Sequence, residues 1–562
     1  KEIEIINEEL YIQYNSSEYA SDSVFKVTNS GFEFASPTDF SLEIKGIDNI
    51  ENKLTVYVKD VGIIFNPDGT YYQVFLPYAP NNYADANAAI RLGSNYWLAD
   101  NQLGLVRYVS EGVYEKISFE GPPRNEFYAM DWYQGMLAIV PGGFQGMLPI
   151  YTPPGVYLFN DEEWTSKGRD NIAFWSGNPA HDVLSISINP TNPNQIAAGT
   201  FSKYGLALME VDGFGIDTFT RYNSTLEYNN PTSNLYQISD VEFDQDGNLW
   251  VLNGFNINPL KLRTSDNEWF EFFLGSVATG KQTKCMVVDY NNNVWMSIQN
   301  SGLVGYNPGG DIKNASDDKT IFLNTGELTG ALPSKEVTAL AVDFDNEIWI
   351  GTDNGFAVLY NSEGSFDEGL GGYNAQRIKL EFEGNVEFVL GNTHITDIEV
   401  DGGNRKWMGT SNSGVVLLSP DGLEILKQFT IENSPIISNT IIDIEIDQKS
   451  GEVFIITDKG LVSFRSDASY EDPDYSDVQI FPNPARPDFD GPITIQGIRF
   501  DSDVKVTDVA GNLVYKTTSN GGTATWDGRT IQGEKVVPGV YLIWTAPNQT
   551  KGRYVGKVLV VN

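Results

Sequence analysis

One short pattern recurs along this chain and constrains its fold more than any other feature. An alternating apolar run ends at an Asp, a tight Asp/Asn/Gly turn follows, an aromatic residue opens a second run, and Gly opens a third. Six residues separate the Asp from the aromatic residue in four copies, and seven separate them in the last. The pairs are Asp244 and Trp250, Asp289 and Trp295, Asp343 and Trp349, Asp401 and Trp407, and Asp447 and Phe454.

The pattern predicts a β-meander. Alternation at period two is typical of half-buried strands, and Asp/Asn/Gly turns tolerate the positive φ that tight hairpins need. Three or four strands in each unit, with no helical stretch between them, is the spacing of a β-propeller blade. A single blade cannot bury both of its faces, so blades must stack in a ring. We therefore expect an all-β protein.

Weaker copies upstream bring the total to ten units. Seven of them lie in residues 118–468, at about 50 residues each, and predict one closed seven-bladed propeller. Residues 1–117 hold only about three units. These cannot close a ring alone, so we expect an incomplete first propeller whose other blades are missing from this chain. A single ten-bladed ring is the alternative.

Two copies resemble a known family. Trp349-Ile350-Gly351-Thr352-Asp353-Asn354-Gly355-Phe356 and Trp407-Met408-Gly409-Thr410 look like the two-component regulator propeller repeat, which is common in proteins of the Bacteroidetes. The resemblance covers residues 1–468 unevenly and is strong from about residue 237 onward. It implies the fold but not the function, because propellers host unrelated activities.

The chain changes character after the last unit. Residues 469–477 form an acidic, Pro-containing linker. Residues 478–562 follow as short alternating strands with turn signals, which predicts a small β-sandwich.

The motifs of this tail resemble the C-terminal domain that directs proteins through the type IX secretion system. That family shares a Pro-Asn-Pro entry, a Val-x-Asp-x-x-Gly hairpin, a Pro-Gly-Val-Tyr strand and a final Lys-Val-Leu-Val strand, and all occur here in order. The resemblance assigns secretion-signal or partner-binding roles to Phe481, Pro482, Asn483, Pro484, Gly539, Tyr541 and Lys557. It also implies export through the periplasm to the exterior of the outer membrane, which explains a start at Lys1 without a leader better than a cytoplasmic location does.

Propellers followed by such a domain resemble the PorZ family, cell-surface components of the type IX machinery. The resemblance implies an attachment complex with the sortase PorU and the outer-membrane proteins PorV and PorQ. It further implies a non-enzymatic scaffold that binds anionic lipopolysaccharide, presents it to the sortase for cargo anchoring, and keeps its C-terminal domain.

Charge excludes several other partners. Lys and Arg number 37 and Asp and Glu 75, so the formal net charge is −38. No surplus of cations is available for a nucleic-acid backbone or a polybasic membrane contact. One cysteine, Cys285, excludes an intramolecular disulfide, and His181 and His394 are too few for a His-rich metal site. The sequence contains no run of 18 apolar residues, so we expect no transmembrane helix.

We expect no cofactor and no dedicated metal site. The turns at Asp244 and Asp343 look like the start of a Ca²⁺ loop, but the bidentate Glu at position twelve and the flanking helices of an EF-hand are missing. Incidental Ca²⁺ binding elsewhere remains compatible with the surplus of carboxylates. The repeated tryptophans are expected in the blade cores rather than on a sugar-binding surface.

Candidate ligand-binding residues lie where the repeat is broken. An insertion at residues 141–154 interrupts two strands, and long loops on rigid scaffolds often carry function. An aromatic segment precedes it. The candidates are Phe127, Tyr128, Trp132, Tyr133 and Phe144.

Two other functions stay open. The protein could be a surface adhesin or glycan-binding propeller exported as cargo, in which case the C-terminal domain should be removed. It could also be a hydrolase, because glycosidases work with paired carboxylates. Facing carboxylates in a deep funnel, with a strongly raised pKa on one of them, would favour the hydrolase.

Overall fold

The computed structural model contains strands and a single short 3-10 helix in the part of the chain that it describes. The described residues are 3–14, 22–35, 44–59, 61–75, 84–101, 103–117, 121–122, 124–146, 148–160, 162–169, 171–172, 175, 180–229, 232, 234–367, 373–382, 385–489, 491–547 and 552–561. The chain divides into two compact units, Lys1–Gly121 and Pro122–Asn562. The all-β prediction is confirmed.

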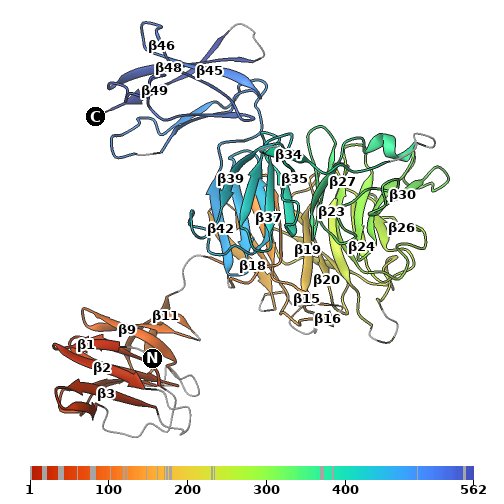
Figure 1. Cartoon of the computed structure of the whole chain (residues 1–562). Helices are drawn as coiled ribbons and strands as arrows, with labels where there is room; N and C mark the ends of the chain where they lie inside the picture. Colours follow the sequence, from red (N-terminus) through yellow and green to blue (C-terminus); the bar gives the residue numbers. More distant parts are fainter. Residues whose placement is uncertain are drawn as a thin grey trace. The chain divides into compact units, whose positions relative to one another are not determined.

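The first unit contains three antiparallel four-stranded sheets, drawn in red to orange in Figure 1. Their strands are β1 (Ile3–Ile6), β2 (Glu9–Tyr14), β3 (Ser23–Thr28), β4 (Gly31–Phe34), β5 (Ile44–Ile50), β6 (Lys53–Val58), β7 (Val61–Phe65), β8 (Tyr71–Phe75), β9 (Ala86–Leu92), β10 (Asn95–Asp100), β11 (Gly104–Ser110) and β12 (Val113–Ile117). One hydrophobic cluster joins the first two sheets and another joins the second and third. The three sheets therefore stack in sequence order, as consecutive blades do.

The second unit begins with seven sheets that surround a common axis. The first three comprise β13 (Ala129–Tyr133), β14 (Met136–Val140), β17 (Gly155–Asn160), β18 (Glu163–Gly168), β19 (Val183–Ile188), β20 (Gln195–Thr200), β21 (Leu206–Glu210), β22 (Ile216–Phe219), β23 (Ile238–Phe243), β24 (Leu249–Asn253), β25 (Leu260–Arg263) and β26 (Trp269–Phe272). The insertion between β14 and β17 forms its own hairpin, β15 (Phe144–Gln145) and β16 (Leu148–Pro149).

The other four blades are less uniform. They comprise β27 (Thr283–Val288), β28 (Val294–Ile298), β29 (Gly302–Asn307), β30 (Lys319–Leu323), β31 (Val337–Val342), β32 (Ile348–Thr352), β33 (Gly355–Leu359), β36 (Ile395–Val400), β37 (Lys406–Thr410), β38 (Val415–Leu418), β39 (Ile425–Phe429), β40 (Ile441–Asp447), β41 (Glu452–Thr457) and β42 (Gly460–Arg465). The fifth and seventh sheets have three described strands. After β33 the chain forms the 3-10 helix η1 (Glu363–Phe366) and a separate hairpin, β34 (Lys379–Phe382) and β35 (Asn385–Phe388).

The ring closes within residues 122–468. Each blade's innermost strand contacts that of the next blade, and β40 of the last blade contacts β13 of the first. A hydrophobic cluster fills each of the seven interfaces between neighbouring blades, including the last-to-first interface, where Phe454 and Ile456 meet Leu137 and Ile139. Figure 1 shows β18 of the first blade beside β42 of the last. This geometry favours a seven-bladed ring over a ten-bladed one.

The repeated Asp and Trp are joined by a hydrogen bond. In four blades the indole Nε1 donates to the carboxylate Oδ2 of the Asp six residues earlier, at 3.0–3.2 Å. Oδ1 of the same Asp accepts backbone N–H groups of the hairpin turn, as Asp343 does from Asp345 and Glu347. All four tryptophans are fully buried between blades, which confirms that they are core residues.

A two-layered sandwich follows the ring. One sheet contains β43 (Gln479–Phe481), β44 (Ile493–Gln496) and β47 (Thr523–Trp526), and the other contains β45 (Ser502–Thr507), β46 (Leu513–Thr518), β48 (Gly539–Pro547) and β49 (Arg553–Val560). Alternate residues of both sheets face a single core built around Trp526, Ile495, Val504 and Ile543. The predicted sandwich is present.

The segment between ring and sandwich is packed rather than extended. Ser469 is fully buried; its carbonyl accepts the N–H of Gly522, and its hydroxyl bonds to Thr523 at 2.7 Å. Gly521 has φ +58°, and a Cβ there would lie 2.3 Å from the carbonyl oxygen of Gly402 in the ring. Only glycine allows this close approach of the two backbones.

Candidate functional site

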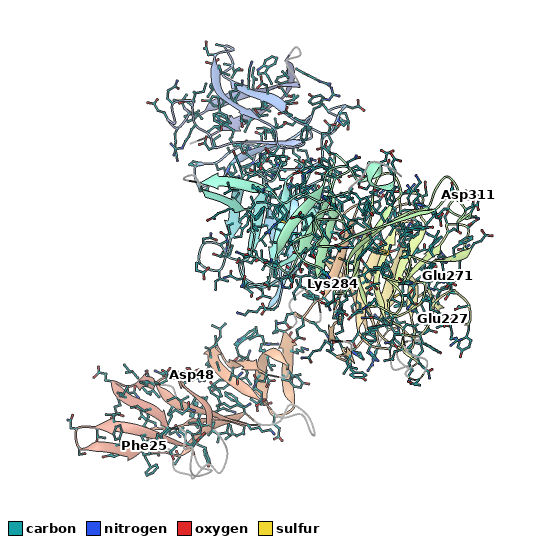
Figure 2. The ribbon with its side chains drawn as sticks, turned by 45° about the vertical axis from the view of Figure 1, so that its right-hand side comes forward. Phe25, Asp48, Glu227, Glu271, Lys284 and Asp311 are labelled. Carbon is teal, nitrogen blue, oxygen red and sulfur yellow. The ribbon has the colours of Figure 1, made fainter. Side chains whose placement is uncertain are left out.

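The central channel of the ring is the main cavity that the described residues enclose around the blade axis. Its volume is about 720 Å³, and the seven innermost strands line it. Lys284, labelled in Figure 2, belongs to its wall. Because successive residues of a strand point to opposite sides, every second residue of these strands faces the channel.

Two layers of carboxylates face the channel. Three innermost strands carry an Asp-apolar-Glu triplet, and β13 adds Asp131. The triplets are Asp240-Val241-Glu242, Asp397-Ile398-Glu399 and Asp443-Ile444-Glu445. All seven acidic side chains are half-buried, and all line the cavity. On β19, β27 and β31 the corresponding positions hold Ser185, Ser187, Cys285, Val287, Ala339 and Ala341, so the carboxylates come from the first, third, sixth and seventh blades.

Several of these carboxylates also join neighbouring blades. The backbone N–H of Met286 donates to Asp240 at 2.7 Å, and that of Ile444 donates to Asp397 at 2.8 Å. Asp443 accepts the N–H of Met130 at 2.6 Å and so bridges the last blade and the first. Asp131 does the same for Ile188. These four aspartates hold the ring together as well as line its channel.

The three channel glutamates accept fewer hydrogen bonds than the aspartates do. Glu399 accepts only the N–H of its neighbour Val400, and the structure shows no hydrogen bond to the carboxyls of Glu242 and Glu445 among the described residues. Burial raises the pKa of all three well above its ordinary value, and neighbouring carboxylates raise it further. Crowded carboxyls in a poorly hydrated space hold protons or attract cations.

The aspartates are also shifted. Burial raises the pKa of Asp240 to about 7 and that of Asp131 and Asp397 to about 6, although the N–H donors partly offset the effect. Burial followed by repulsion from Asp397 raises the pKa of Asp443 well above its usual range. The channel therefore carries less negative charge near neutral pH than seven carboxylates would suggest.

The basic and nucleophilic groups of the channel are few. Lys284 and His394 line it, and burial and the nearby Lys284 lower the pKa of His394. Burial raises the pKa of the Cys285 thiol to about 12, so the thiol stays protonated. A neutral, poorly accessible thiol is a weak nucleophile.

The structure separates the five aromatic candidates. Tyr128 lines the channel and contacts Phe144 of the insertion, with ring centroids 6.2 Å apart. Tyr133, at the other end of β13, also lines the channel and donates its hydroxyl to Pro190. Phe127 is buried and Trp132 half-buried in the cluster that closes the ring. Tyr128 and Phe144 are the pair that the fold brings together.

The Pro-Asn-Pro segment clasps the final strand of the sandwich. The side-chain amide of Asn483 donates to the carbonyl of Lys557 and accepts the N–H of Leu559, at 2.9 and 3.0 Å. Ala485 continues the contact by exchanging backbone hydrogen bonds with Leu559 and Val561. Pro482 and Pro484 flank this contact, each after a cis peptide bond. The clasp covers part of an edge that would otherwise stay unpaired.

The remaining residues of this motif series also meet in the sandwich. Gly539 opens β48 and pairs with Val560, and Tyr541 is buried against Trp526 with its hydroxyl donated to Val537. Phe481 ends β43 and lies under the guanidinium of Arg465 from the last blade. Motifs far apart in the sequence therefore build one structural unit.

In the turns that look like Ca²⁺ loops, the carboxylates accept hydrogen bonds within their own blade. Both carboxylate oxygens of Asp244 and of Asp343 accept hydrogen bonds from their own turn or their own tryptophan. Within the described residues no group of three or more His, Cys, Asp or Glu side chains is arranged to hold a metal ion.

The sequence interpretation missed the channel carboxylates. Their signal is the Asp-apolar-Glu triplet, which recurs at the start of three innermost strands. Each triplet also fits ordinary strand alternation, with a polar face toward solvent, and only ring closure turns that face inward.

Comparisons with known proteins agree with this architecture. Residues 331–354 match the two component regulator propeller family. Among solved structures, PorZ of Porphyromonas gingivalis, described as an essential bacterial surface component of the type-IX secretion system, aligns with all of this chain and 75% of its own, at 24% identity and a TM-score of 0.69. The chain has the fold of PorZ.

A second solved structure is less similar to the chain. The extracellular domain assigned to a hybrid two-component system of B. thetaiotaomicron covers 98% of this chain and 76% of its own at 13% identity, but its TM-score is only 0.31. No curated protein matches the chain significantly in sequence. The likeness to PorZ includes the sandwich as well as the propellers, since the alignment covers the whole chain.

Proposed function

We propose that this protein is a non-enzymatic cell-surface component of the type IX secretion system. In this role it is a scaffold of the attachment complex that presents anionic lipopolysaccharide to the sortase for cargo anchoring. The observation that carries the proposal is the correspondence with PorZ over the full length of the chain, from the first blades to the C-terminal sandwich.

The junction between ring and sandwich supports a retained C-terminal domain. A cargo protein loses this domain at an accessible linker, but here Ser469 is fully buried and Tyr470 packs against Phe344 of the ring. Asp472 accepts the N–H groups of Asp474, Ser476 and Asp477 and folds the rest of the linker into a turn. A protease acts on extended, exposed chain, so this packing favours a machine component over cargo.

Charge restricts where an anionic ligand would bind. The net charge is −38 and the channel is lined by seven carboxyls, so an anionic lipopolysaccharide would be repelled there. We therefore place its contact outside the channel and expect PorU, PorV and PorQ-like proteins to supply part of the site.

The proposed location is the exterior of the outer membrane, reached through the periplasm. The described part of the chain has no helix with the length and hydropathy that a membrane span requires. The resemblance of the Pro-Asn-Pro segment and the final strand to the type IX C-terminal domain supports export by that route.

Three measurements test the proposal. Mass spectrometry of the surface-exposed protein should recover peptides from residues 478–562, and the protein should co-purify with the sortase. Deleting the gene should trap other proteins with this C-terminal domain in the periplasm. A surface form that ends near residue 470, together with normal secretion of other cargo, would move the assignment to the alternative, a cargo adhesin or glycan-binding propeller.

The channel favours a hydrolase as the second candidate. Facing carboxyls with raised pKa values are what a glycosidase needs. Against it, the four aspartates serve as acceptors between blades. Turnover of an oligosaccharide library that disappears in Glu242→Gln or Glu399→Gln would establish the hydrolase.

A further inference from the structure

A second cavity, of about 1010 Å³, lies between the fifth and sixth blades. It lies where the described residues of the fifth blade form three strands and no regular fourth one. After β33 the chain pairs again at a single bridge, Val358 with Gln376, and then leaves the blade as the β34–β35 hairpin. The volume suits a small ligand.

One wall of this cavity is cationic. The guanidinium of Arg377 lies 3.8 Å from the centroid of the Phe388 ring, and the ammonium of Lys379 lies 5.6 Å from the same centroid. Neither cation forms an ion pair with a described carboxylate. Two adjacent cations without a carboxylate partner among the described residues are unusual on a chain with 75 acidic residues and 37 basic ones.

Arg377 is also incompletely satisfied. Its Nη2 donates to the carbonyl of Gly391 at 2.8 Å, but its Nε is buried and has no hydrogen-bond partner. A buried charged donor without an acceptor is unfavourable, because it has lost its hydration without gaining a hydrogen bond. An anionic group in the cavity would accept hydrogen bonds from the free N–H groups of the Arg377 guanidinium. It would also stabilise the stacking of that guanidinium on the Phe388 ring.

Acidic side chains also line the cavity: Asp345, Glu347 and Asp421. Burial followed by repulsion from Asp343 raises the pKa of Glu347 to about 7, and the nearby Lys406 ammonium, which is paired with Asp343, partly offsets the effect. Tyr360 and Leu423 complete the lining with half-exposed apolar surface.

We propose that this cavity binds a small zwitterionic ligand, with its anionic group on Arg377 and Lys379 and its ammonium group on Asp345 and Glu347. The Phe388 side chain offers an apolar surface for the part of the ligand between the two charges. Amino-sugar phosphates and phosphoethanolamine headgroups share this chemistry. The site is separate from the channel and does not depend on the proposed role in secretion.

Four probes test the charge requirement on the full chain by calorimetry: glucosamine 6-phosphate, glucosamine, glucose 6-phosphate and glucose. Glucosamine 6-phosphate should bind at least tenfold more tightly than glucosamine or glucose 6-phosphate, each of which lacks one of the two charged groups, and glucose should not bind. Binding to vesicles with and without phosphatidylethanolamine tests whether the ligand is a lipid headgroup. Binding to these vesicles without binding to glucosamine 6-phosphate would assign the site to a lipid headgroup. Equal binding of all four sugars and of both vesicles, or no binding at all, would overturn the proposal.

Variants separate the site from general charge effects. Arg377→Gln and Glu347→Gln should each weaken glucosamine 6-phosphate binding at least tenfold. Arg221→Gln is the matched control, because Arg221 also lies over an aromatic ring, that of Tyr228, but outside the cavity. Thermal unfolding of each variant checks the fold. An unchanged affinity in a folded Arg377→Gln protein would contradict the proposal.

Discussion

The indole Nε1 of Trp349 donates a hydrogen bond of 3.1 Å to Oδ2 of Asp343. The same carboxylate accepts the turn N–H groups through Oδ1, so one Asp fixes both a hairpin and the core residue that follows it. The six-residue spacing of the repeat is the distance along the chain that this contact requires. In the last blade Phe454 has no N–H to donate, and there the spacing is seven.

Replacing Trp349 tests this unit. Trp349→Ala should lower the free energy of unfolding by about 3–5 kcal/mol, because it leaves a cavity between the fifth and sixth blades. Trp349→Phe keeps most of the volume but removes one donor from Asp343, and should cost about 1–3 kcal/mol. Denaturant unfolding measures both. Phe214→Ala, at a position 67% exposed, is the control and should change stability by less than about 0.5 kcal/mol.

The channel predicts a particular pH dependence. The pKa of Asp240 is about 7 in the folded protein against an ordinary 3.8, so the folded state holds a proton that the unfolded state has lost. The stabilisation from this group is complete below about pH 4 and is lost as the pH rises through 7. Asp240→Asn cannot ionise and keeps an acceptor for Met286.

We therefore expect Asp240→Asn to be more stable than the parent at pH 8, by roughly 1–3 kcal/mol, and to show a shallower loss of stability between pH 4 and 8. Thermal unfolding at several pH values measures this. Asp503→Asn, on the sandwich, should leave the slope unchanged. A parallel pH profile for Asp240→Asn and the parent would show that the channel carboxyl is not held neutral.

The hydrogen bonds of Asn483 should help to hold the final strand, β49, in the sandwich. Asn483→Ala removes both side-chain bonds to β49 and should cost the sandwich about 1–3 kcal/mol. The amide of Leu559 should then exchange with solvent faster. Hydrogen exchange followed by mass spectrometry measures this, with peptides from the propeller as internal reference. Unchanged protection at Leu559 would mean that the Asn483 side chain does not secure the strand, and that its pairing with β48 and Ala485 is sufficient.

The junction predicts a protease-sensitive variant. Gly521→Ala places a Cβ 2.0 Å from the carbonyl of Ser469, so ring and sandwich should separate and residues 469–477 should become cleavable. Gly511→Ala is the matched control: its φ is also positive, at +87°, but its Cβ would lie in open space. Limited proteolysis compares the two. Equal cleavage would assign any effect of Gly521→Ala to backbone strain alone.

Removing residues 558–561 tests the role of the sandwich in export. The loss exposes a sheet edge and opens the core, because Val558 is fully buried. The propellers should stay folded but remain in the periplasm, and secretion of other type IX cargo should stall. Fractionation follows both pools. Normal surface display of the truncated protein would refute the export role, and unaffected secretion of other cargo would favour the adhesin.

The sequence predicted the local features of the fold, but it did not predict the features that depend on how the ring closes. The strands, the buried tryptophans and the sandwich follow from alternation, turn residues and short motifs, each confined to about 20 residues. The channel carboxyls depend on which face of a strand the ring turns inward. The pocket beside Arg377 depends on how residues 373–388 leave the fifth blade after a single bridge, and the repeat in the neighbouring blades gives no sign of that departure.

The bond between Met130 and Asp443 spans 313 residues of sequence and joins the first blade to the last. A chain made at about 5–20 residues per second waits roughly 15–60 s between synthesising one partner and the other. During that time the first blade's open side, with Leu137 and Ile139, has no neighbour to cover it. The ring can therefore close only late in biosynthesis. Until then the incomplete propeller exposes apolar surface, and the cell has to keep it from aggregating.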